Sequence, residues 1–327
     1  MLVTGGAGYI GSHATLALVD AGYTVSVLDD LSTGHRSAVP ADMRFHHGDV
    51  GDVALLDAVL GGGEVDAILH FAGSIVVPES VTDPVKYYAN NTANTLALIA
   101  AAVRHEVRHF VFSSTAAVYG VTEQVPIPES APTLPTTPYG TSKLVSEWML
   151  RDTAAAHPLR YTALRYFNVA GADPHGRAGQ SHDGATHLIH VAAEHLSGRR
   201  EEVAIFGSDY PTPDGTAIRD YIHVSDLADA HVLALDRLLG GGDSLIANCG
   251  YGRGYSVLEV LDAVARFAGR PLTTRLVERR AGDLPILVAQ CSRIRSELGW
   301  TPRHDDLDRI VADAIRWEAK LRETDRA

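Results

Sequence analysis

Residues 4–11 read Thr-Gly-Gly-Ala-Gly-Tyr-Ile-Gly and lie between a short apolar strand and a helix that ends near Gly22. Glycines at this spacing are typical of a turn that binds a dinucleotide. Gly5 permits a tight turn, Gly8 lets the main chain approach a pyrophosphate, and Gly11 lets the helix pack closely against the strand. The helix N-terminus then offers unpaired N–H groups to the anion. The stretch predicts a phosphate-binding turn, although glycines alone would also suit a purely structural one.

A carboxylate follows the next strand at the position that such a turn requires. The strand 24–28 ends at Asp29, which lies 18 residues after Gly11. A carboxylate there can accept hydrogen bonds from both hydroxyls of an adenosine ribose, and it would repel a 2′-phosphate. The sequence therefore predicts NAD as the cofactor. Arg36 is close enough in the sequence to keep NADP as the alternative.

Short β-branched runs alternate with helical patterns through the first half of the chain. The strand-like runs are 23–28, 65–72, 109–114 and 161–169. This alternation predicts a doubly wound parallel sheet with helices on both faces and ligands at the carboxyl ends of the strands. The helical segment 83–107 is rich in small residues, which suits either an interface or a buried core helix.

The second half of the chain is richer in loops and returns to the first pattern once. We expect a helix at 186–197 and a strand at 203–206, then a strand, helix and strand at 220–224, 225–239 and 244–249. Ser256 and Glu259 form a capping box before a helix at 257–267, and a last helix spans 307–322. We predict a Rossmann-like domain at 1–170 that takes back about 218–250. A smaller α/β substrate-binding domain covers 171–217 and 251–327.

Composition excludes several classes of function. The net charge of −12 would repel nucleic acid and anionic membranes. Cys249 and Cys291 are far apart with no CxxC pair, which favours a reduced compartment, with the cytoplasm as the default. No apolar run reaches about 18 residues, so we expect no membrane span.

Tyr139 and Lys143 are the candidate reacting groups. They lie four residues apart at the start of a helix that Pro138 opens, so the phenol and the ammonium share one face. A free tyrosine has a pKa of about 10. A nearby lysine and a positive nicotinamide ring would both favour phenolate, which could then act as a general base. Hydroxyls at the end of the strand-like segment 112–119 could orient a substrate alcohol beside it. Alone, a tyrosine and lysine at this spacing would usually be a packed ring and a solvated amine.

These features together resemble the extended short-chain dehydrogenase/reductase superfamily and, within it, the UDP-glucose 4-epimerase family. The resemblance spans nearly the whole chain. Its motifs are GGAGYIGSH at 5–13, DDLSTG at 29–34, SSTAAVYG at 113–120, YGTSK at 139–143, RYFNVAGA at 165–172, DGTAIRDYIHV at 214–224 and RRAGDLP at 279–285.

The resemblance implies a role for each matching residue. The catalytic residues would be Thr115, Tyr139 and Lys143. The cofactor would contact Gly5, Gly8, Tyr9, Ile10, Gly11, Asp29, Asp49, Val50, Phe71, Ala72, Gly73, Asn90, Ser113, Tyr139, Lys143 and Phe167. A UDP-sugar would contact Thr115, Tyr139, Asn168, His187, Leu188, Ala204, Phe206, Arg219, Arg280, Asp283 and Leu287. It also implies a homodimer built on the helices near 83–107 and 138–156.

Three positions depart from the family pattern. The run 74–77 lacks a lysine that helps to hold the cofactor, which implies weaker NAD retention. His187 replaces an asparagine of the substrate loop, and it can still donate a hydrogen bond. Leu287 stands where some members have a tyrosine that closes the sugar pocket, so we expect room for an N-acetyl group.

Rival functions are each opposed by particular residues. A nucleotide-sugar 4,6-dehydratase needs two carboxylates just after the catalytic hydroxyl, and Ala116 and Ala117 stand there. A non-catalytic NAD-binding protein would not need the three catalytic residues together. His187, His190 and Glu194 could share a helical face as metal ligands. Coincidence explains them better, so we expect no metal.

Overall fold

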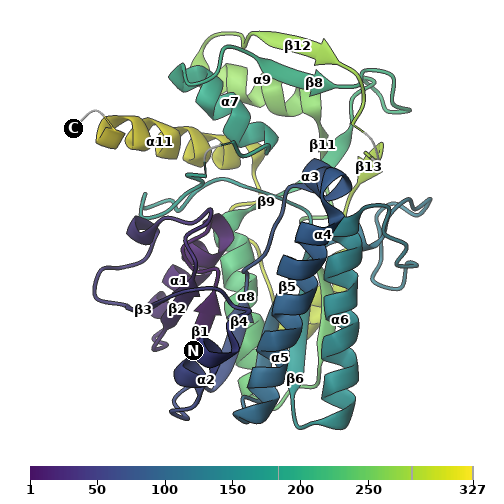
Figure 1. Cartoon of the computed structure of the whole chain (residues 1–327). Coiled ribbons are helices and arrows are strands. Elements are labelled where there is room, and N and C mark those ends of the chain that lie inside the picture. Colours follow the sequence, from purple (N-terminus) through teal and green to yellow (C-terminus); the bar gives the residue numbers. More distant parts are fainter. Residues whose placement is uncertain (183, 281–282, 326–327) are drawn as a thin grey trace.

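Seven parallel strands form the central sheet of the computed structural model, which describes residues 1–182, 184–280 and 283–325 (Figure 1). The strands lie in the order β10 (Leu245–Cys249), β6 (Arg160–Tyr166), β5 (His109–Thr115), β4 (Ala67–His70), β1 (Leu2–Thr4), β2 (Ser26–Asp29) and β3 (Arg44–His47). The chain winds outward from β1 in both directions, so the strand order reverses between β1 and β4. The doubly wound, Rossmann-like sheet is therefore confirmed.

Alternate residues of these strands enter two separate cores. Val3, Val27 and Leu69 belong to one buried cluster, whereas Leu2 and Ile68 belong to the other. Side chains that alternate along a strand point to opposite faces, so both faces of the sheet are buried. The helices α1 (Tyr9–Asp20) and α8 (Val224–Leu239) pack together on one face, and the other carries α2 (Val53–Leu60), α5 (Asn94–Arg104) and α6 (Pro138–Ala156).

The helical segment predicted at 83–107 runs without a break over 84–104, with a change of hydrogen-bond pattern inside it. After α3 (Val77–Thr82), it consists of α4 (Pro84–Tyr87), a π-helical turn over Tyr88–Ala93, and α5. The turn buries Asn91, which is 2% exposed. Such π-helical turns are often found at functional sites.

A smaller lobe contains two further sheets (Figure 1). In the first, β9 (Ile218–His223) pairs with β7 (Asn168–Ala170), β11 (Gly254–Ser256) and β13 (Ile286–Leu287). In the second, β8 (Val203–Phe206) pairs with β12 (Thr274–Val277). The helices of this lobe are α7 (Leu188–Ser197), α9 (Val257–Ala268) and α11 (Leu307–Asp325), whereas α10 (Ser292–Leu298) packs against β10 and α8 beside the central sheet.

The strand expected at 220–224 exists as β9, but it belongs to the small sheet, whereas β10 joins the central one. The division into two domains stays a prediction. The capping box is confirmed, because the Ser256 hydroxyl accepts the Glu259 N–H and the Glu259 carboxylate accepts the Ser256 N–H. Among the helices that the structure describes, none is long and apolar enough to cross a membrane.

Candidate active site

The predicted cofactor residues converge because they follow the carboxyl ends of neighbouring parallel strands. Each group stands at the end of one strand or directly after it in the chain. The groups are residues 5–11 after β1, Asp29 at the end of β2, Asp49 and Val50 after β3, Phe71, Ala72 and Gly73 after β4, Ser113 and Thr115 at the end of β5, and Phe167 after β6. The reversal of strand order between β1 and β4 opens a crevice at this edge in folds of this class. The sheet topology therefore brings together what the sequence spaces far apart.

The glycine turn is as tight as its sequence predicts. Gly5 has a φ of 71°, and a Cβ there would lie 2.5 Å from the main-chain nitrogen of Ala72. A Cβ on Gly11 would lie 2.1 Å from the Gly5 carbonyl oxygen. Helix α1 begins at Tyr9, so its first N–H groups face the turn. The Tyr9 hydroxyl donates to the carbonyl of Gly171 at 2.7 Å, which ties the start of α1 to the chain beyond β7.

Asp29 already supports this turn through its side chain. Its carboxylate accepts the N–H of Ala7 and the N–H of Leu31, each at 2.9 Å. Each carboxylate oxygen keeps further acceptor capacity for a ribose hydroxyl. Burial raises the pKa of this carboxyl, and the two N–H donors act in the opposite direction. The guanidinium of Arg36 donates to the Val39 carbonyl at 2.8 Å and lies 4.8 Å from the centre of the Phe45 ring. Arg36 is therefore engaged by residues of its own region of the chain.

Helix α6 places the reacting residues. Thr137 caps it by accepting the Gly140 N–H, and Pro138 occupies its first turn. Tyr139 is 8% exposed and Lys143 3%, one helical turn further on. The amine of Lys143 donates to the main-chain carbonyl of Ser113 at 3.0 Å, which joins α6 to β5. The side chain of Thr115 is close enough to the phenol of Tyr139 to lower its pKa.

The pKa of Tyr139 differs in direction from the sequence-based expectation. Burial raises it, and the nearby side chain of Thr115 lowers it by less. Burial also lowers the pKa of Lys143 to about 8. Both shifts have one cause, which is that a low-dielectric site disfavours the charged form of each group. The protein alone therefore keeps the phenol protonated, and the positive charge of a bound nicotinamide would act in the opposite direction.

Apart from Thr115 on β5 and Tyr139 on α6, the predicted UDP-sugar residues lie in the smaller lobe. Arg219 forms an ion pair with Asp283, and the guanidinium of Arg280 lies 3.7 Å from the centre of the Phe206 ring. Burial lowers the pKa of Arg280. Leu287 pairs with Arg219 in register between β13 and β9. The remaining residues are Asn168 in β7, Ala204 two positions before Phe206 in β8, and His187 and Leu188 at the start of α7.

His187 is engaged by a neighbour, because its Nδ1 lies 2.7 Å from the amide nitrogen of Gln180. Burial lowers the pKa of His187 to about 4, so the ring is neutral at physiological pH. The Nε2 of His190 lies 3.5 Å from the Glu194 carboxylate. In the part of the chain that the structure describes, no group of three histidine, cysteine, aspartate or glutamate side chains could hold a metal ion.

Two buried polar residues near the site were not predicted from the sequence. The side chain of Asn91 binds both the N–H and the carbonyl of Ser74, at 2.7 and 2.9 Å, and the hydroxyl of Ser142. Glu147 binds Arg165 and Ser114. The pair of asparagines at 90 and 91 is a sequence signal that could have pointed to Asn91, but no local pattern marks Glu147.

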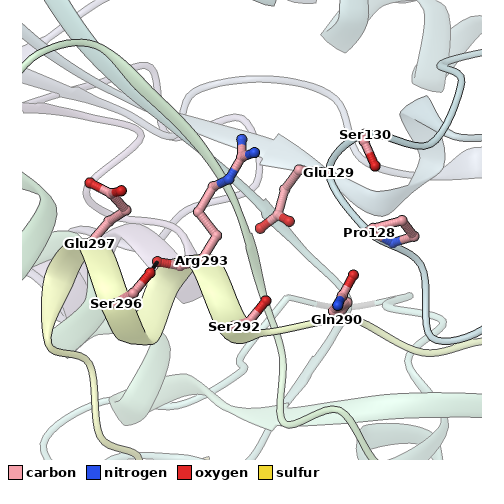
Figure 2. A pocket seen from close by; sticks show the side chains of 8 residues that line it. All are labelled: Pro128, Glu129, Ser130, Gln290, Ser292, Arg293, Ser296 and Glu297. Atoms are coloured by element: carbon pink, nitrogen blue, oxygen red, sulfur yellow. Dashed lines mark hydrogen bonds between the residues drawn. The ribbon is translucent and has the colours of Figure 1, made fainter.

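A surface groove of about 370 Å³ contains none of the predicted residues (Figure 2). It lies between the loop at 128–130 and α10, and Figure 2 shows Glu129 and Arg293 on facing sides. The lining residues are Pro128, Glu129, Ser130, Gln290, Ser292, Arg293, Ser296 and Glu297. It is shallow and polar, unlike an enclosed small-molecule site.

Comparison with known proteins shows similarity to NAD-dependent epimerases. Residues 1–250 match the model of the NAD-dependent epimerase/dehydratase family. A UDP-glucose 4-epimerase of Azospirillum brasilense is 59% identical over 99% of this chain and 93% of that protein.

Solved structures give the same result. A UDP-glucose 4-epimerase from Brucella ovis in complex with NAD is 45% identical with a TM-score of 0.93, over 97% of this chain and 98% of that one. The UDP-Glc/GlcNAc 4-epimerase of Campylobacter jejuni is 44% identical with a TM-score of 0.85, over 98% of each chain. The chain therefore belongs to the NAD-dependent epimerase/dehydratase family of enzymes.

Proposed function

We propose that the chain is a UDP-glucose 4-epimerase, which interconverts UDP-glucose and UDP-galactose by transient oxidation at C4 of the sugar. The observation that carries the proposal is the buried arrangement of Thr115, Tyr139 and Lys143 at the carboxyl edge of the sheet. Full-length similarity to UDP-glucose 4-epimerases supports it. Such an enzyme serves galactose metabolism.

The residues of the chain divide the work of this reaction. When bound, NAD supplies a reversible hydride acceptor, which the turn at 5–11 and Asp29 would hold. Tyr139 takes the proton of the sugar 4-hydroxyl and later returns it, while Thr115 orients that hydroxyl. The charge of Lys143 favours the phenolate. The 4-keto sugar rotates in the site, so that C4 is then reduced on its other face.

The nucleotide half of the substrate requires a firm grip while the sugar turns. Arg219 and Arg280 would bind the diphosphate, because guanidinium groups match phosphate geometry with paired N–H donors. Phe206 offers an aromatic face beside Arg280. Contacts with UDP would therefore supply most of the binding energy, and the sugar stays free to present either face of C4 to the nicotinamide.

A 4,6-dehydratase is the nearest alternative within the family. Elimination of water needs an acid and a base beside C5 and C6 of the sugar. The turn Ala116–Val118, which follows Thr115, carries only apolar side chains. Incubation with UDP-glucose should therefore give UDP-galactose and no 4-keto-6-deoxy sugar, as followed by NMR of the products. Detection of the deoxy sugar would favour the dehydratase over the epimerase.

The substrate range rests on Leu287, which lies beside Arg219 in the small sheet. A leucine leaves more room than a tyrosine, so UDP-N-acetylglucosamine should also be epimerised. In the Leu287→Tyr variant we expect kcat/KM for that sugar to fall at least ~10-fold relative to UDP-glucose, since overpacking costs about 1–3 kcal/mol. A wild-type chain that converts only UDP-glucose would remove this idea, and the same panel can include UDP-pentoses and UDP-uronates.

The proposed assembly is a homodimer, as the family resemblance implies. Large apolar side chains are exposed on α4, the π-helical turn, α5 and α6, which pack side by side (Figure 1). They are Val85 (75% exposed), Tyr88 (40%), Leu96 (52%) and Trp148 (45%). Exposed apolar side chains on neighbouring helices suit a protein–protein interface. We place the enzyme in the cytoplasm, which suits its two free, buried cysteines.

A further inference from the structure

A row of polar side chains crosses three neighbouring strands, and helix α6 packs over the first two of them, β5 and β6. Ser114 of β5 pairs in register with Arg165 of β6, which pairs with Asn248 of β10. Residues paired in register lie on the same face of a parallel sheet. The strands thus place a hydroxyl, a guanidinium and an amide side by side, all three at most 5% exposed.

Glu147 of α6 contacts two members of this row, Ser114 and Arg165. Its carboxylate accepts the Ser114 hydroxyl and the Nε of Arg165, the latter at 2.9 Å, and its second oxygen pairs with another guanidinium nitrogen. The remaining guanidinium nitrogen donates to the Tyr119 hydroxyl at 3.1 Å, which donates to Asn248 at 2.7 Å. Burial alone would lower the pKa of Arg165, but the paired carboxylate outweighs it and raises that pKa.

The position of this network relative to the catalytic residues is specific. Ser114 directly precedes Thr115, and Glu147 lies one helical turn beyond Lys143. Helix α6 is therefore fastened to β5 at two points, by Lys143 to the Ser113 carbonyl and by Glu147 to the Ser114 hydroxyl. The two bonds therefore join the helix that carries Tyr139 to the strand that carries Thr115.

A buried ion pair adds little net stability, since apolar side chains of similar volume often do as well or better. We infer that Glu147 is a positioning residue: its contacts with Ser114 and Arg165 hold helix α6 so that Tyr139 and Thr115 meet the same sugar hydroxyl. The inference rests on the proposed function. Displacement of a reacting group by about 1 Å can cost about 100-fold in rate, so loss of the fastening should lower kcat.

The test replaces the network by apolar side chains. In the variant Ser114→Ala/Glu147→Met/Arg165→Met no buried charge is left unpaired, so the chain should fold with a thermal midpoint close to wild type. We expect kcat for UDP-glucose at least ~10-fold lower with KM within about 3-fold, because the diphosphate grip lies in the other lobe. A folded variant with the kcat of wild type would overturn the inference, since a merely structural network would be replaced without loss.

A single substitution decides the question if that variant does not fold. Ser114→Ala removes the bond between β5 and Glu147 and leaves the ion pair of Glu147 with Arg165. Ser197→Ala is its matched control, because the Ser197 hydroxyl donates at 2.8 Å to the buried carboxylate of Glu318 on α11. The first should lower kcat and the second should not; equal kcat values would overturn the inference. A wild-type chain without epimerase activity would instead contradict the proposed function.

Discussion

Replacement of Tyr139 by phenylalanine should lower the turnover of UDP-glucose at least ~100-fold, because the phenol is the group assigned to move the proton of the 4-hydroxyl. The ring itself should stay in place. It is 8% exposed and meets the ring of Tyr87 edge-on at 6.4 Å, a contact that phenylalanine can keep. The variant should therefore fold and bind NAD as the wild type does. Turnover is measured by NMR of the UDP-sugars and NAD binding by fluorescence titration.

Tyr161→Phe is the control for this substitution. Tyr161 is also buried, at 5% exposed, but it lies near the start of β6, at the opposite end of the sheet from the catalytic edge. Its kcat should match that of the wild type. Near-normal turnover by Tyr139→Phe would show that another group carries the proton and would end the assignment.

Gly11→Ala should destabilise the fold by at least about 3 kcal/mol, at the upper end of the usual cost of overpacking. The added Cβ would lie 2.1 Å from the Gly5 carbonyl oxygen and 2.9 Å from the Gly6 Cα. All these atoms are main chain, so no side chain can move aside to relieve the contact. Urea unfolding without NAD measures the effect.

Gly8→Ala separates the steric role of this turn from its binding role. A Cβ on Gly8 would approach only the Gly5 carbonyl oxygen, at 3.3 Å, and its φ of −79° suits any residue. We expect stability close to wild type and weaker NAD binding, because the methyl group would stand where the main chain approaches the pyrophosphate. If Gly11→Ala unfolded at the same urea concentration as Gly8→Ala, the close-packing role of Gly11 would be wrong.

Local patterns in the sequence were enough to predict the features that depend on neighbouring residues. The glycine turn, the carboxylate at Asp29, the capping box at Ser256 and the helix that carries Tyr139 each depend on a few consecutive residues. Strand β3 offers no such pattern. It reads Arg-Phe-His-His, with neither an apolar run nor β-branched residues, and becomes a strand because β2 pairs with it.

Features that depend on distant partners could not be predicted. Strand β9 resembles a central strand in sequence, and only its pairing with β7 and β11 places it in the small sheet. The ion pair of Glu147 with Arg165 depends on where α6 crosses the strands. The raised pKa of Tyr139 depends on burial, which a helical spacing does not reveal. The site residues themselves stay a prediction that the proposed variants test.

Strand β3 is the outer strand of the central sheet on one side, so its position has a consequence for solubility. An unpaired strand edge can add a strand from another chain and so begin aggregation. Here the edge is four residues long and its exposed side chains are Arg44 and His47. Arg44 also pairs at the surface with Glu64 at 3.1 Å. A short edge that carries charge resists strand addition, so the parallel sheet can end in solvent without recruiting another chain.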